Sequence, residues 1–160
     1  MKAIAIDDEP LALSVIDIFC RKSPMIDLVA QFSGGREGLS YLDEHDDIDL
    51  IFLDINMPHL SGVEVAKMVA HRAMIIFTTA YQDFAVEGFE LEAVDYLMKP
   101  FSFERFSTAA DRAYELLQLR RGKEGDNVQQ KDVSHIMVKS DSSLVKIAID
   151  SIIVIEGLKD

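Results

Sequence analysis

Short apolar runs alternate along this chain with longer segments of helical periodicity, and this alternation limits the possible folds more than any other feature. The apolar runs occupy residues 3–6, 28–32, 50–53, 74–77 and 93–97. Continuous apolarity is typical of strands that are covered on both faces, as in parallel sheets. The sequence therefore predicts an α/β domain with a doubly wound five-stranded parallel sheet, five helices and right-handed crossovers.

Three of the predicted helices carry specific signals. In the first, Leu11, Val15, Ile18 and Phe19 recur at helical spacing behind Pro10, a residue that the first helical turn tolerates. A capping box at residues 61–64 (Ser-Gly-Val-Glu) predicts a helix over residues 63–70. The last helix is expected to present one long apolar face, made of Phe103, Phe106, Ala110, Ala113 and Leu117.

The pattern changes after residue 120. Residues 121–133 are polar, contain two glycines and have no periodicity, which predicts a linker. Beyond the linker, apolar residues alternate with a period of two over residues 136–138 and 145–149, and a further apolar run follows at 152–155. We therefore expect a domain over residues 1–120, a linker over 121–133, and over 134–160 a short antiparallel β tail from an incomplete second domain.

Composition excludes several classes of partner. The formal net charge of −12 argues against a nucleic-acid or anionic membrane surface, because such surfaces are bound mainly through Lys and Arg. No apolar run approaches the roughly 18 residues of a membrane span. The single cysteine, Cys20, excludes an intramolecular disulfide, fits a reducing cytoplasm and is expected to be a small buried side chain.

Polar side chains gather where the predicted strands end. In an open parallel sheet, chemistry collects at the carboxyl ends of the strands, beside the point where the strand order reverses. The residues that the sequence delivers to this edge are Asp7, Asp8, Glu9, Asp54, Asn56, Thr78, Thr79 and Lys99. Several carboxylates, hydroxyl groups and one lysine are therefore expected to share one crevice.

Crowded carboxylates repel one another, so the crevice needs a cation. Mg²⁺ with oxygen ligands suits it best, whereas the four scattered histidines make a zinc site a poor alternative. Beside Mg²⁺ and Lys99, Asp54 could act as a nucleophile that accepts a phosphoryl group. Lys99 would offset the charge on the phosphoryl oxygens, and the Thr79 hydroxyl would help to hold the product.

Four motifs at these strand ends resemble the receiver domain of bacterial response regulators. They are residues 7–10 (Asp-Asp-Glu-Pro), 54–58 (Asp-Ile-Asn-Met-Pro), 79–80 (Thr-Ala) and 96–101 (Tyr-Leu-Met-Lys-Pro-Phe). The resemblance covers roughly residues 1–120 and implies the flavodoxin-like fold of these receivers. It also implies that Asp54 receives its phosphoryl group from a sensor histidine kinase.

The same resemblance implies roles for individual residues. Mg²⁺ would be bound by Asp8, Asp54 and the Asn56 carbonyl, with Asp7 acting through water. Thr79, followed by Ala80, and Tyr96 would form the switch that responds to phosphorylation. The peptide bond between Lys99 and Pro100 is expected to be cis, and a homodimer face would use the fourth and fifth helices with the fifth strand.

The tail has a resemblance of its own. Residues 136–141, 145–147 and 155–160 are similar to the opening strands of the LytTR-type DNA-binding domain. The base-reading parts of such a domain are absent, so DNA binding is expected only from a longer parent chain. We expect these strands to pack on the receiver, to pair with another chain or to be mobile, because two or three unpaired strands are marginal alone.

Simpler interpretations stay open for the single residues. Residues 7–9 could be acids attracted to a helix N-terminus, Asp54 a surface cap, and Thr79 and Tyr96 ordinary strand and core residues. Thr78 is the nearest competitor of Thr79, and its expected place is inside the strand.

For the whole chain we expect a phosphorylation-dependent switch of a two-component system that regulates transcription, without turnover of a separate substrate. The first alternative is a Mg²⁺-dependent phosphatase or phosphotransferase that forms an aspartyl phosphate. Such enzymes usually have an Asp-x-Asp pair, and here Asn56 takes the second position. The second alternative is a stand-alone receiver that acts through protein contacts.

Overall fold

The computed structural model describes residues 1–69, 71–80, 93–126, 135–140 and 143–148. The chain divides into two compact units, Met1–Leu119 and Arg120–Asp160, and each is described by itself. The helix expected between the fourth and fifth strands falls on residues 81–92, which lie outside the described residues.

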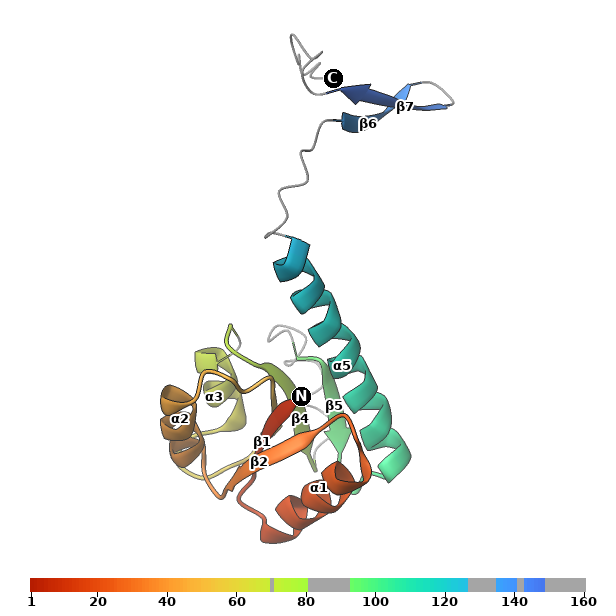
Figure 1. The fold of residues 1–160 in the computed structure, drawn as a ribbon. Helices are drawn as coiled ribbons and strands as arrows, with labels where there is room; N and C mark the ends of the chain where they lie inside the picture. The colour runs from red at the N-terminus through yellow and green to blue at the C-terminus, as the bar shows by residue number, and fades with distance from the viewer. Residues whose placement is uncertain (70, 81–92, 127–134, 141–142, 149–160) are drawn as a thin grey trace, which may run out of the picture. The chain divides into compact units, whose positions relative to one another are not determined.

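The first unit is built on a five-stranded parallel sheet, as the sequence predicts. Its strands are β1 (Lys2–Ile6), β2 (Asp27–Phe32), β3 (Leu50–Asp54), β4 (Met74–Thr79) and β5 (Asp95–Met98). They lie in the order β2-β1-β3-β4-β5, and every neighbouring pair is parallel (Figure 1). The strand order therefore reverses beside β1 and β3, so their carboxyl ends meet at the switch point where ligands collect in such sheets.

Among the described residues, two helices cover each face of the sheet. Helices α1 (Pro10–Lys22) and α5 (Phe103–Asp126) lie on one face, and α2 (Gly35–Glu44) and α3 (Gly62–Val69) lie on the other (Figure 1). All residues of β3 and β4 are buried, whereas exposed and half-buried positions alternate in the edge strand β2. The apolar runs of β1, β3 and β4 are thus strands that are covered from both sides, whereas the run of β2 lies at the sheet edge.

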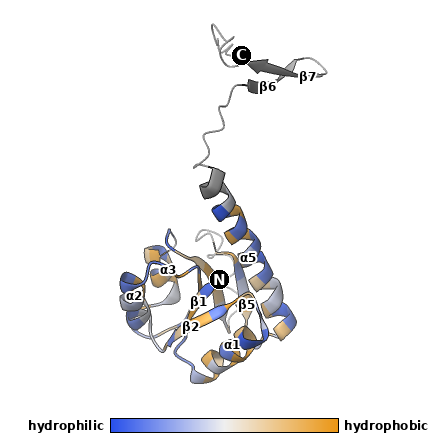
Figure 2. Cartoon of the chain, viewed as in Figure 1, coloured by the Kyte–Doolittle hydropathy of each residue, from blue (hydrophilic) through white to orange (hydrophobic). Residues whose placement is uncertain are grey.

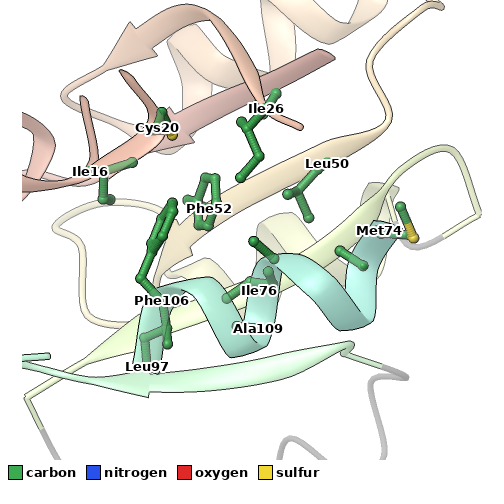
Figure 3. Close-up of a cluster of buried hydrophobic side chains, with 14 of the residues drawn as sticks. Ile16, Cys20, Ile26, Leu50, Phe52, Met74, Ile76, Leu97, Phe106 and Ala109 are labelled. Carbon is green, nitrogen blue, oxygen red and sulfur yellow. The ribbon is translucent and has the colours of Figure 1, made fainter. Parts of the chain in front are cut away.

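The core under α1 and α5 is rich in aromatic rings. Phe106 of α5 stacks on Phe52 of β3 with ring centroids 5.2 Å apart (Figure 3). The Phe19 ring of α1 lies 5.5 Å from the Phe106 ring, centroid to centroid. Most of the face predicted for α5 is buried here, since Phe106, Ala110, Ala113 and Leu117 all belong to this core. Figure 2 shows hydrophobic and hydrophilic residues alternating around α5, as a helix with one buried face requires.

The apolar face predicted for α1 is partly wrong. Leu11 is 75% exposed and Ile18 is 49% exposed, whereas Ile16 and Cys20 are buried. This helix carries two overlapping apolar stripes, and the sheet takes the one centred on Ile16. The expectation for Cys20 is confirmed, and burial raises the pKa of its thiol to about 12.

The capping box of α3 is present. The backbone N–H of Ser61 donates to Glu64 Oε2 at 2.9 Å, and the backbone N–H of Glu64 donates to Ser61 Oγ at 3.3 Å. Helix α5 differs from expectation because it continues through Asp126, past the predicted linker boundary at residue 121. Its last residues include Arg, Lys and Glu, which are good helix formers and need no apolar face to extend a helix.

The second unit contains a β-hairpin. Strand β6 (His135–Ser140) pairs antiparallel with β7 (Ser143–Ala148), in a register that places Ile136 opposite Ile147. The further run at residues 152–155 lies outside the described residues. Within the described part of the chain, no helix is both long and apolar enough to cross a membrane.

Candidate functional site

The carboxyl ends of β1, β3 and β5 bring three charged side chains into contact. Asp7 directly follows β1, Asp54 is the last residue of β3, and Lys99 directly follows β5. The Lys99 Nζ lies 2.9 Å from Asp7 Oδ2 and 3.0 Å from Asp54 Oδ1. These residues are up to 92 positions apart in the chain, and the strand order β2-β1-β3-β4-β5 is what makes them neighbours.

Lys99 is held in this position by backbone as well as by side-chain contacts. Its backbone N–H donates to the Thr79 carbonyl at 2.7 Å, which continues the ladder between β4 and β5. The Lys99–Pro100 peptide bond is cis, as the resemblance implies. A third carboxylate, Glu9, places Oε1 3.0 Å from Lys99 Nζ.

The charges of the site act on one another. Burial raises the pKa of the Asp54 carboxyl, the neighbouring Asp7 and Asp8 raise it further, and the contact with Lys99 opposes them without cancelling the rise. Burial by itself lowers the pKa of the Lys99 ammonium, but the ion pairs with Asp7, Asp54 and Glu9 outweigh it and leave that pKa raised. Lys99 is therefore protonated at neutral pH, and the carboxylates remain crowded.

Three carboxylates of this crevice are arranged like ligands of a cation. Asp7, Asp8 and Asp54 each offer one oxygen, and the three oxygens lie within 4.8 Å of one another. Asp7 and Asp54 are buried, while Asp8 and Asn56 are exposed. Oxygen ligands with open positions for water match the preference of Mg²⁺. Burial is the main cause of the raised pKa of Asp54, and the repulsion from Asp7 and Asp8 that adds to it is what a cation would relieve.

Asp7 has two further partners that orient it. Thr78 Oγ1 donates to Asp7 Oδ2 at 3.3 Å, and the backbone N–H of Glu9 donates to Asp7 Oδ1 at 3.0 Å. Sequence reasoning brought Thr78 and Glu9 to this edge of the sheet but predicted neither of these contacts. The available signal for Thr78 was the Thr-Thr pair at residues 78–79, because successive strand residues point to opposite faces.

The residues of the expected switch lie beside this cluster. Thr79 ends β4 and is 4% exposed, and Ala80 follows it in an exposed position. Tyr96 of β5 stacks on Phe77 with ring centroids 5.5 Å apart. Its hydroxyl is buried and has no hydrogen-bond partner among the described residues, and burial raises the pKa of this phenol.

An ion-pair cluster fixes the backbone next to Tyr96. The Asp95 carboxylate, which is nearly buried, accepts hydrogen bonds from Arg105 and Arg112 of α5 and from the Tyr96 backbone N–H. Arg105 also donates to the Tyr96 carbonyl at 2.7 Å. This cluster ties β5 to α5, and sequence reasoning did not identify it.

The structure argues against two of the simpler interpretations, those for Asp54 and for Asp7. Asp54 is 4% exposed and contacts Lys99, so the surface-cap hypothesis is wrong. Asp7 is fully buried, so it is not a solvated acid at a helix end, whereas Asp8 and Glu9 are exposed.

A parallel sheet in the order 2-1-3-4-5, with an acidic crevice and a half-buried lysine at its switch point, defines a doubly wound flavodoxin-like domain with a polar site at the strand ends. Comparison with known protein families identifies a family within this fold class. Residues 3–111 match the family described as the response regulator receiver domain. The chain belongs to this family.

Known relatives agree with this assignment. The transcriptional regulatory protein YpdB of Escherichia coli K12 is 40% identical over 110 residues, which are 67% of this chain and 45% of YpdB. The sensory transduction protein LytT of Oceanobacillus iheyensis is 34% identical over 146 residues, which are 88% of this chain and 56% of LytT. The chain thus spans about half the length of the curated relatives it matches.

A solved structure shows the same fold. The crystal structure of the response regulatory domain of MrkE from Klebsiella pneumoniae is 34% identical in sequence and superimposes with a TM-score of 0.69. The match covers 74% of this chain and 99% of that domain.

Proposed function

We propose that Asp54 is the phosphoryl acceptor of a Mg²⁺-dependent signalling switch in a two-component system. The observation that carries this proposal is the contact of the half-buried Lys99 with Asp54, at 3.0 Å, beside two further carboxylates whose oxygens lie close enough to share a cation with Asp54. The charges of the crevice suit a phosphoryl group that arrives together with a cation.

The chemistry follows from the positions of the side chains. One carboxylate oxygen of Asp54 attacks the phosphorus of a phosphohistidine, the P–N bond breaks, and the leaving imidazole takes up a proton. Lys99 donates hydrogen bonds to the phosphoryl oxygens, whose negative charge grows in the loose transition state. Asp7, Asp8, Asp54 and the Asn56 carbonyl would hold Mg²⁺, which offsets the same charge when it is bound.

The response to phosphorylation is assigned to the end of β4 and to β5. Thr79 and Ala80 lie at the carboxyl end of β4, where the Thr79 hydroxyl can be drawn towards a phosphoryl group on Asp54. The buried Tyr96 hydroxyl lacks a partner among the described residues, so its ring can move without the loss of a hydrogen bond to them. Tyr96 stacks on Phe77, which lies two residues before Thr79 in β4, and β5 is part of the face proposed for homodimers.

The phosphoryl donor is a sensor histidine kinase in the cytoplasm, and the chain catalyses only its own phosphorylation and dephosphorylation. The enzyme alternative is weaker because Asn56 stands where aspartyl-phosphate phosphatases usually have a second aspartate.

Residues 121–160 are proposed to be the linker and first strands of a LytTR-type DNA-binding domain in a longer transcriptional regulator. Two observations support this assignment: the match to LytT extends over 146 residues, and β6 and β7 form a hairpin outside the receiver unit. A stand-alone receiver would not require this segment.

Phosphorylation with acetyl phosphate and Mg²⁺ tests the acceptor. The wild-type chain should gain one phosphoryl group, seen by intact-mass spectrometry, and Asp54→Asn should gain none while it keeps its fold by circular dichroism. Asp111→Asn, which changes an exposed aspartate of α5, is the matched control and should be labelled like the wild type. Labelling of Asp54→Asn would place the acceptor elsewhere.

A further inference from the structure

The Lys99 ammonium has as many anionic partners as it has N–H groups. A lysine ammonium carries three donors and no acceptor. Its Nζ lies 2.9 Å from Asp7, 3.0 Å from Asp54 and 3.0 Å from Glu9. A phosphoryl oxygen that binds Lys99 must therefore displace one of these three carboxylates.

The three carboxylates differ in how costly they are to displace. The side chains of Asp7 and Asp54 are 0% and 5% exposed, so either would be left as a buried charge without its cation. The Glu9 side chain is 61% exposed, and water can solvate it after release. Glu9 is therefore the partner that leaves Lys99 most easily.

Glu9 also occupies an unusual position for a glutamate. It is the N-cap of α1, with φ −92° and ψ 110°, where Ser, Thr, Asp or Asn would cap the helix. Its carboxylate makes no capping hydrogen bond to α1 and contacts Lys99 across 90 positions of sequence instead. Glu9 and Lys99 border a surface hollow of about 440 Å³, which is also lined by Leu11, Pro100 and Phe101.

We infer that Glu9 is a positioning residue that occupies one donor of Lys99 until a phosphoryl oxygen takes its place. This inference rests on the function proposed above. Each phosphorylation event then includes the separation of an exposed ion pair, which slows the reaction. Exposed ion pairs of this kind contribute only a small stabilising free energy. Loss of the Glu9–Lys99 pair should therefore accelerate phosphorylation only modestly, by up to about fivefold.

Three variants separate this contact from its alternatives. Glu9→Gln removes the charge, and Glu9→Asp keeps the charge on a side chain one carbon shorter, which no longer reaches Lys99. Glu104→Gln, an exposed glutamate in the first turn of α5, changes the net charge equally without this contact. The rate of phosphorylation of each full chain by acetyl phosphate and Mg²⁺ is followed on phosphate-affinity gels, at about 0.05 and 0.5 M salt.

The expected result is that Glu9→Gln and Glu9→Asp are both phosphorylated faster than the wild type, whereas Glu104→Gln is not. The difference in phosphorylation rate between each Glu9 variant and the wild type should become smaller at high salt, because salt screens the Glu9–Lys99 ion pair of the wild type. A purely structural effect of the substitutions would not depend on salt in this way. Wild-type rates for Glu9→Asp would show that charge alone matters and would overturn the inference. Unchanged or slower phosphorylation of Glu9→Gln would also overturn it, while a wild type that takes up no phosphoryl group would refute the proposed function itself.

Discussion

Thr78 donates a hydrogen bond from its Oγ1 to Asp7 Oδ2 at 3.3 Å, and both residues are fully buried. The bond fixes the direction of a carboxylate that also contacts Lys99. Because these residues come from β4 and from the end of β1, the hydroxyl links two strands that do not pair with each other. Asp7 thereby keeps its place in the candidate metal site.

Replacement of this hydroxyl is the first prediction. Thr78→Val keeps the shape of the side chain and removes the donor, so it should lower the free energy of unfolding by about 1 kcal/mol and weaken Mg²⁺ binding. Thr78→Ser keeps a hydroxyl and should retain Mg²⁺ affinity close to that of the wild type. Urea unfolding and titration calorimetry with Mg²⁺ measure the two effects. Equal Mg²⁺ affinity of the valine and serine variants would show that this bond does not orient Asp7.

Magnesium should stabilise the folded chain, because it relieves the repulsion among Asp7, Asp8 and Asp54. At ten times its dissociation constant, a ligand of the folded state adds about 1.4 kcal/mol, which raises the Tm of a domain of this size by roughly 3–6 °C. Asp8→Asn is a suitable control, since Asp8 is exposed and its loss should not disturb the core. Differential scanning calorimetry should show the shift in the wild type, its reversal by EDTA and a smaller shift in the variant. No shift at millimolar Mg²⁺ would count against a metal site.

Gly62 allows β3 and α3 to approach closely. A Cβ at this position would lie 2.0 Å from the Asp54 carbonyl oxygen and 2.9 Å from the Asp54 carbonyl carbon. The backbone would have to move, so Gly62→Ala should destabilise the chain by roughly 3 kcal/mol and slow phosphorylation at Asp54.

Gly122→Ala provides the contrast, because a Cβ there meets no described atom within 4 Å and alanine favours the helix. Its expected effect is a gain of up to about 1 kcal/mol, measured by urea unfolding of both variants. A mild effect at Gly62 would mean that the contact between α3 and the end of β3 is not tight.

The Asp95 cluster should make stability depend on pH. Burial alone raises the pKa of the Asp95 carboxyl, but hydrogen bonds from Arg105 and the Tyr96 backbone N–H outweigh it and leave that pKa lowered. The folded state therefore binds this proton more weakly than the unfolded state does. The stabilisation is complete above the ordinary aspartate pKa of about 3.9 and is lost as pH falls through the lower folded-state value.

The variant Asp95→Asn isolates this contribution. Near pH 7 it should be less stable than the wild type by about 2 kcal/mol, and the difference should shrink below about pH 4. Urea unfolding of both chains at a series of pH values measures the difference directly. A difference that stays constant down to about pH 3 would show that the charge of Asp95 contributes nothing.

The Tyr96 hydroxyl offers the opposite case, a buried polar group without a hydrogen-bond partner among the described residues. Removal of such a group loses no hydrogen bond, so Tyr96→Phe should leave stability unchanged or raise it by up to about 1 kcal/mol. Chemical unfolding is the measurement. A marked loss of stability would reveal a partner for this hydroxyl in the folded chain.

Much of the site could be predicted because its residues lie at the ends of strands that the sequence marks clearly. The runs that contain Ile4, Phe52 and Ile76 are apolar throughout, which is the pattern of strands buried on both faces. Once these strands are parallel, geometry brings their carboxyl ends together, and Asp7, Asp54 and Lys99 must be neighbours. The capping box of α3 was predictable for a similar reason, since it depends on residues three positions apart.

Other features depend on packing. The sequence of α1 allows two apolar stripes, and contact with the sheet selects Ile16 and Cys20 over Leu11 and Ile18. The cluster around Asp95 requires that Arg105 and Arg112, seven residues apart on α5, both face β5. No local sequence pattern predicts this. The length of α5 beyond residue 120 also escaped prediction, because polar residues can extend a helix without leaving a periodic trace.

Local sequence patterns were therefore enough to predict the sheet, the ends of its strands and the acidic and basic residues located there. These features depend only on neighbouring residues and on the general geometry of parallel sheets. The tertiary structure decided which partners the side chains have. Thr78 contacts Asp7, Glu9 contacts Lys99, and the Phe77 ring stacks on Tyr96. Such pairings depend on distances of a few ångströms between residues 19 to 90 positions apart, and those distances are set by the packing of whole strands and helices.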